Sequence, residues 1–122
     1  IENGGDIFLR STRDVTVGLF AGESTLSYKL NLLVKKEKTP LGICTSSATV
    51  GPSLSFGRAD AVTVISKSAV LADAAASAIG NRVFSKNDIK KTLELGIKID
   101  GVYGIVIIIG SEMGAIGEIE FV

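Results

Sequence analysis

The sequence predicts an α+β fold, in which a mixed, largely antiparallel sheet packs with two or so helices. Short apolar runs with strand character come before and after one helical stretch, which differs from the regular strand and helix alternation of parallel sheets. The chain has 122 residues, enough for one hydrophobic core. Hydrophobic residues make up 46% of it, and 13 basic residues balance 13 acidic ones, as in a globular domain.

The first part of the chain is expected to form a turn and three strands. Turn-forming residues at 3–6 precede an apolar run at 7–9, which predicts the first strand. Alternation of apolar and other residues predicts a strand over 15–20, and a second apolar run predicts one over 28–34. The charged run at 35–38 is interpreted as a solvated turn, with phosphate binding as the less favoured alternative.

The middle of the chain predicts two strands and a helix. Strands are expected over 41–44 and 61–65, the second because of its β-branched residues. Ser68 is a suitable cap for a helix over 69–79, and Gly80 with Asn81 is expected to end it in a left-handed conformation. The residues expected to form its buried stripe are Val70, Leu71, Ala74, Ala75 and Ala78.

The last part of the chain predicts a second helix and two strands. Ser85 and Asp88 have the spacing of a capping box, and Ile89, Leu93 and Ile97 mark the apolar face of the helix that follows. The nearly continuous apolar run over 102–109 is typical of a strand covered on both faces. Residues 110–117 are expected to turn the chain into a final strand over 118–122. The total is about seven strands and two helices.

Composition excludes several classes of function. A net charge of zero argues against a nucleic-acid partner, and the longest apolar run is far shorter than the roughly 20 residues of a membrane-spanning helix. Cys44 is the only cysteine and histidine is absent, which argues against internal disulfides, zinc sites and a Ser-His-Asp triad. A reducing, cytoplasmic location is expected, although Ile1 is not an initiator methionine and a signal could precede it.

Asp73 and Ser77 are the candidate metal ligands. They are four residues apart, so a helix places them on one face, one turn from each other. Their oxygens suit a hard cation such as Mg²⁺, whose other ligands are usually water and phosphate. The alternative that Asp73 only caps or solvates an exposed turn stays open. It is, however, the only charged residue between Lys67 and Arg82.

Hydroxyl and glycine residues form the candidate ligand-binding segments. Thr45, Ser46, Ser47 and Thr49 are expected in a loop whose hydroxyl and N–H groups can surround phosphate oxygens, and a plain polar loop is the alternative. The glycines at 4–5 allow close approach to a ligand. Cys44 is interpreted as a small buried apolar residue.

Three motifs resemble those of a known family. Residues 3–6 read Asn-Gly-Gly-Asp, residues 45–47 read Thr-Ser-Ser, and residues 72–78 read Ala-Asp-Ala-Ala-Ala-Ser-Ala. They are similar, in the same order, to the Asn-x-Gly-Gly-Asp, Thr-Ser-Gly and Ala-Asp-Ala-Leu-Ala-Thr-Ala motifs of the ApbE FAD:protein FMN transferases. The chain resembles most an uncharacterised ApbE-like family of archaea and bacteria. It is expected to be either a single domain over 1–122 or the C-terminal half of such a domain, completed by an N-terminal segment or a second copy.

The resemblance implies a protein that binds FAD or a related nucleotide with Mg²⁺ and transfers FMN to a Ser or Thr of an acceptor protein. Asp73 and Ser77 would then hold the metal. The residues implied to line the flavin pocket are Asn3, Gly4, Gly5, Asp6, Thr45, Ser46, Ser47 and Thr49. The His-Ile-x-x-Pro motif of the family has no counterpart, because the chain has no histidine. A non-catalytic binding or assembly protein is therefore the alternative, and the resemblance to the ApbE-like family implies that it would serve anaerobic sulfur assimilation.

Overall fold

The structure, a computed structural model, describes residues 2–3, 6–21, 24–26, 29–46 and 58–122. The strands in these residues are β1 (Glu2–Asn3), β2 (Asp6–Leu9), β3 (Val15–Gly18), β4 (Asn31–Val34), β5 (Leu41–Ser46), β6 (Ala61–Ser66), β7 (Val102–Ile109) and β8 (Glu112–Gly117). The helices are α1 (Ala69–Gly80) and α2 (Ile89–Gly96), with short 3-10 turns η1 (Lys36–Lys38) and η2 (Lys86–Asp88). The predicted α+β class is confirmed.

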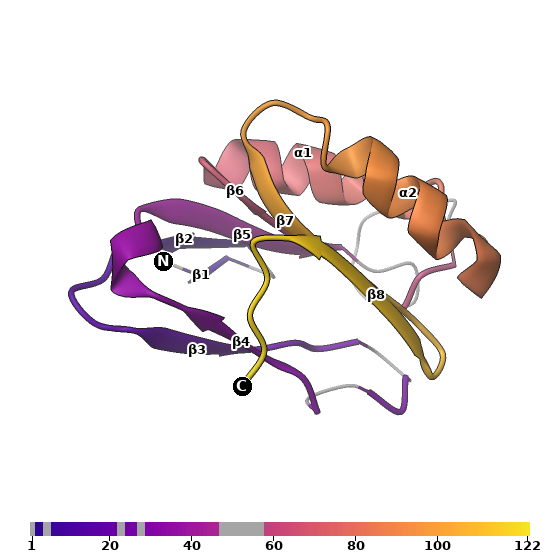
Figure 1. Cartoon of the computed structure of the whole chain (residues 1–122), viewed down its shortest axis with the longest axis horizontal. Helices are drawn as coiled ribbons and strands as arrows, with labels where there is room; N and C mark the ends of the chain where they lie inside the picture. Colours follow the sequence, from indigo (N-terminus) through magenta and orange to yellow (C-terminus); the bar gives the residue numbers. More distant parts are fainter. Residues whose placement is uncertain (1, 4–5, 22–23, 27–28, 47–57) are drawn as a thin grey trace.

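Six of the strands form one sheet in the order β1-β2-β5-β6-β7-β8, and every neighbouring pair is antiparallel. Strands β3 and β4 form a separate antiparallel pair. Both helices lie on one face of the large sheet, and the β3–β4 pair lies on the other (Figure 1). Neither helix in the described part of the chain has the length and apolarity needed to cross a membrane.

The large sheet separates two hydrophobic clusters. On β6, Val62 and Val64 belong to the cluster under the helices, whereas Ala61 and Ile65 belong to the cluster under the β3–β4 pair. Successive side chains of a strand point to opposite faces, so a strand covered on both faces is apolar at nearly every position. This explains why all residues of β6 are buried.

Helix α1 begins as predicted but buries a different face. Ser68 is its N-cap, with the Leu71 N–H donating to Ser68 Oγ at 3.1 Å. Three residues of the predicted stripe are wrong, because Val70 is 81% exposed and Ala74 and Ala78 are also exposed. Ala75 is buried as predicted. The residues of α1 that are buried are Ala72, Ala75, Ala76, Ile79 and Gly80. Because almost every residue of α1 is apolar, the sequence pattern could not distinguish one face from another.

Two other predicted details at chain turns are wrong. Asn81 follows α1 with a right-handed backbone (φ −67°, ψ −12°), so no left-handed stop ends this helix. The last strand, β8, lies at Glu112–Gly117, where a turn was expected. Gly117 has a φ of +81°, and this left-handed conformation bends the chain away from β8.

Residues 118–122 leave the large sheet and run beside β4. The Leu33 N–H donates to Glu120 O at 2.8 Å, and the Val122 N–H donates to Asn31 O at 3.0 Å. Leu32 and Phe121 form a single antiparallel bridge. The predicted strand over 118–122 is thus limited to this one bridge, and the segment connects the two sheets.

The predicted capping box at Ser85 and Asp88 is present, and it precedes η2 and α2. Asp88 Oδ2 accepts from the N–H groups of Phe84 at 2.9 Å and Ser85 at 3.1 Å, and Lys91 Nζ lies 3.0 Å from Oδ1. The hydrogen bond from Phe84, followed by that from Lys91, holds the pKa of Asp88 below its usual value of 3.8.

This lowered pKa predicts a pH-dependent contribution of Asp88 to stability. A carboxylate with a lower pKa in the folded state stabilises the fold above its unfolded pKa, and this stability is lost as the pH falls through the folded pKa. We expect Asp88→Asn to lower the Tm at pH 7, and the difference from wild type to shrink as the pH falls below 3.8. Thermal unfolding at pH 7 and at pH 3 measures both values. An equal difference at the two pH values would contradict the prediction.

Candidate functional site

Three of the segments predicted to form the site meet at Cys44 on β5. Cys44 is buried, with 2% of its surface exposed. Its Sγ donates a hydrogen bond to Asp73 Oδ1 on α1, with 3.6 Å between the two atoms. Within the sheet, Cys44 is also the direct cross-strand partner of Asp6 on the neighbouring strand β2. The fold therefore brings the N-terminal motif, the end of β5 and the acid of α1 together.

Asp73 and Ser77 are both exposed on α1. Four helical residues rise by about 6 Å, so the two side chains can contact the same bound group. Asp73 is the fifth residue of α1, because the helix begins at Ala69. It therefore does not cap the helix, and this part of the alternative interpretation is wrong.

The hydroxyl residues at 45–46 belong to a strand and not to a loop, because β5 extends to Ser46. They consequently point to opposite faces of the sheet. Thr45 Oγ1 lies 2.9 Å from Thr63 Oγ1 on β6, on the face away from the helices. Ser46 lies on the helix face, with its Oγ 3.9 Å from where a Cβ at Gly80 would be. Of these two, only Ser46 shares a face with Asp73.

The other predicted pocket residues are placed only in part. Asn3 is the cross-strand partner of Asp6 in the β1–β2 pair, so its backbone adjoins that of Asp6. The positions of Gly4, Gly5, Ser47 and Thr49 lie outside the described residues. The structure thus places Asp73 against Cys44, with Ser46 on the same face of β5, Ser77 one turn along α1 and the backbone of Asp6 paired with Cys44. Thr45 lies on the opposite face.

Asp73 and Ser77 suit a cation that takes only a few ligands from the protein and keeps water or phosphate oxygens as the others. The described residues contain no group of three or more His, Cys, Asp or Glu side chains that could enclose a metal ion. Mg²⁺ does not need such an enclosure, because it commonly uses one or two protein carboxylates together with water and phosphate oxygens. The Asp73 carboxylate and the Ser77 hydroxyl would be its ligands on α1, and water or the phosphate oxygens of a bound ligand would complete the shell.

The sequence did not predict the contact between Cys44 and Asp73. Cys44 was interpreted only as a small buried apolar residue, and its burial is confirmed. Its contact with Asp73 depends on the register between β5 and α1, which no motif encodes. The only available signal was its position immediately before the Thr45–Ser46 hydroxyl pair.

A cavity of about 310 Å³ lies on the other side of the sheet from Asp73. It lies between β4 and residues 118–120, at the ends of β5 and β6. Residues that line it include Lys35, Lys38, Leu41, Ile65, Tyr103, Glu118 and Glu120. Lys38 Nζ forms an ion pair with Glu118 Oε1 at 2.7 Å across its rim. The predicted site residues that the structure describes do not line this cavity.

The fold and the site together define an α+β protein with two helices on one face of an antiparallel sheet. One of these helices, α1, carries an exposed carboxylate and an exposed hydroxyl one turn apart. A family model described as "AbpE bacteria" matches residues 1–113, and the chain belongs to this family. It is similar to UPF0280 proteins of Methanococcus maripaludis strain C5 (52% identity over 125 residues) and Methanocaldococcus jannaschii (46% over 123 residues). Each match covers 97% of this chain, which spans about half the length of these relatives.

The expected membership of the ApbE FAD:protein FMN transferases, including its ApbE-like branch, is wrong. The family that matches is AbpE bacteria, and the two relatives named above carry UPF0280 names, which state no flavin transfer. Short motifs of glycine, alanine and hydroxyl residues led to the mistaken assignment. Such residues recur wherever a backbone must turn or a helix must pack closely, so a few short matches do not define a family.

Proposed function

We propose that the protein binds a phosphate-bearing nucleotide, such as a flavin nucleotide, through Mg²⁺ at the interface of β5 with α1. The observation that carries the proposal is the contact of Asp73 with Cys44, on a strand whose backbone pairs at that residue with Asp6 of the N-terminal motif. The apolar helix α1 has a single acid, and that acid is exposed one turn from a hydroxyl. This arrangement supports metal-bridged binding of phosphate oxygens.

Calorimetric titration of the protein with FAD, with and without MgCl₂, tests the proposal. We expect binding that requires Mg²⁺ and that becomes roughly tenfold weaker or more in Asp73→Asn, because the substitution removes the charged ligand while keeping the shape of the side chain. Asp100→Asn is the matched control, since Asp100 is exposed in the turn before β7. Equal affinities of wild type and Asp73→Asn, or binding that ignores Mg²⁺, would contradict the proposal.

The catalytic form of this proposal is transfer of FMN to a protein hydroxyl. The hydroxyl oxygen would attack the FMN phosphorus of FAD and form a phosphoester with it, while the phosphoanhydride bond breaks and AMP leaves. The hydroxyl proton would pass to the AMP phosphate or to water. Release of AMP that requires both Mg²⁺ and an acceptor protein is the measurement for this step. If FAD bound but no AMP were released, the transfer step would be contradicted and the binding proposal would still stand.

A non-catalytic binding or assembly protein is the second candidate. It is favoured by the small number of ionisable groups at the site, since the described residues hold no cluster of three potential metal ligands and the sequence has no histidine. General acid-base catalysis needs a titrating side chain within hydrogen-bonding reach of the reacting group. Asp73 would then position a ligand without taking part in a reaction.

A further inference from the structure

The outer face of α1 is unusually apolar for a surface in contact with water. Its exposed positions have the spacing of a single helix face. They are Val70, Asp73, Ala74, Ser77 and Ala78. Val70 is 81% exposed, and Asp73 is the only charged residue among the 12 residues of α1. A helix that is apolar on all sides is typical of the interior of a protein.

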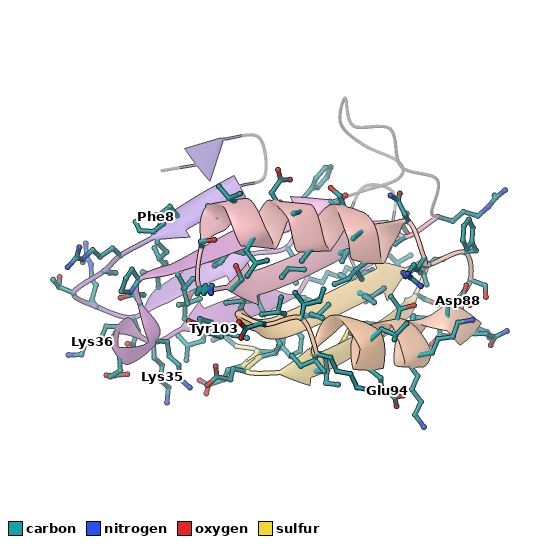
Figure 2. All side chains as sticks on the ribbon, turned by 90° about the horizontal axis from the view of Figure 1, so that it is seen from above. Phe8, Lys35, Lys36, Asp88, Glu94 and Tyr103 are labelled. Atoms are coloured by element: carbon teal, nitrogen blue, oxygen red, sulfur yellow. The ribbon has the colours of Figure 1, made fainter. Side chains whose placement is uncertain are left out.

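Helix α2 shows that this composition is not general for the helical layer. The two helices lie side by side over the same face of the sheet (Figure 2). On α2, Ile89 and Leu93 are buried, while Lys90, Lys91 and Glu94 are exposed. This is the ordinary amphipathic pattern of a helix between a core and water. Only α1 has side chains suited to burial on both faces.

The apolar surface continues from α1 onto β2. Phe8 is 44% exposed and lies beside the first turn of α1 (Figure 2). It is the cross-strand partner of Gly42, the residue against which the start of α1 packs. Among the described strands, helix α1 contacts β5 and β6 more extensively than β2, so Phe8 on β2 is only partly covered by the helix. We name the outer face of α1 together with Phe8 the α1 surface.

We propose that the α1 surface packs against the half of the family's polypeptide that this chain does not match. The matched region spans only 49% of the Methanococcus maripaludis strain C5 relative, so the family contains a second segment of similar length. Small side chains at Ala74 and Ala78 allow another segment to approach the α1 backbone closely. The proposal does not depend on nucleotide or Mg²⁺ binding, although Asp73 and Ser77 lie on the same surface.

One substitution compared in two proteins tests this packing. Ala74→Glu is made in the present chain and at the corresponding residue of the full-length Methanococcus maripaludis strain C5 relative. In the present chain we expect the Tm to change by no more than about 1 °C, because the position is exposed and glutamate is a good helix former. In the relative we expect a fall of about 5 °C or more, because the carboxylate would be buried without a partner.

Leu95→Glu is the matched control, since Leu95 is 52% exposed on α2, outside the α1 surface. It should change the Tm equally in both proteins. As a second measurement that does not require folding of the glutamate variant, Ala74→Cys is reacted with a maleimide, and we expect labelling to be at least roughly tenfold slower in the relative. Equal Tm shifts and equal labelling rates would overturn the proposal. So would light scattering that shows a dimer of the present chain which Ala74→Glu dissociates, because the occupant would then be a second copy.

Discussion

Gly42→Ala is expected to destabilise the protein severely or to prevent folding. A Cβ on Gly42 would lie far inside van der Waals contact with the backbone of Ser68 and Ala69, where α1 begins. Gly42 also pairs with Phe8 on one side and Ser66 on the other, so β5 cannot shift without breaking both ladders. Backbone atoms cannot move aside as a flexible side chain can. We expect a loss of about 3 kcal/mol or more in the free energy of unfolding.

Chemical denaturation measures this loss, and Gly80→Ala is the matched control. A Cβ at Gly80, the last residue of α1, would meet its nearest atoms at 3.7 and 3.9 Å, which is ordinary contact. Alanine also favours the helix over glycine. The control should therefore be neutral or slightly stabilising. If the two variants unfolded at the same denaturant concentration, the result would contradict the close packing of Gly42 on β5 against the start of α1.

Ile107→Ala is the second substitution expected to have a large effect. Ile107 is 0% exposed and belongs to the cluster between the sheet and the helices. It lies on β7 with Val62 and Gly114 as cross-strand partners. Truncation removes apolar contacts and leaves a cavity that a rigid sheet cannot close. We expect a loss of about 3 to 4 kcal/mol, within the usual range for such truncations.

Ile99→Ala provides the comparison for this loss in the same denaturation experiment. Ile99 is 36% exposed in the turn between α2 and β7, so fewer of its contacts are lost. We expect a change of less than about 1 kcal/mol. Losses of similar size for the two variants would show that Ile107 does not lie in a closely packed core.

The sequence predicted those elements whose signals are local. The β-branched run of β6, the long apolar run of β7 and the capping box before α2 all reflect preferences of neighbouring residues. The buried face of α1 could not be predicted, because its alanines make every face similar. The position of β8 was also missed, since Glu112–Gly117 contains two glycines besides its apolar residues and resembles a turn.

The candidate site was predicted as a set of residue types rather than as an arrangement. Asp73 and Ser77 share a helix face as expected, because helical spacing alone decides this. The separation of Thr45 from Ser46 depends on whether β5 continues past Cys44. A shift from loop to strand makes neighbouring side chains point to opposite faces, so one misplaced boundary changes which hydroxyl can contact a ligand.

The pairing of residues 118–122 with β4 also has a consequence for how fast the protein folds. Leu32 and Phe121 form a bridge although they are 89 positions apart (121 − 32) in a chain of 122 residues. Closing so long a loop reduces chain entropy before any contact compensates for it, and topologies rich in such distant contacts fold slowly. The β3–β4 pair is a local hairpin and can form early. Its connection to the C-terminal segment is expected to be among the last steps, and the amides of Leu33 and Val122 among the last to gain protection from hydrogen exchange during refolding.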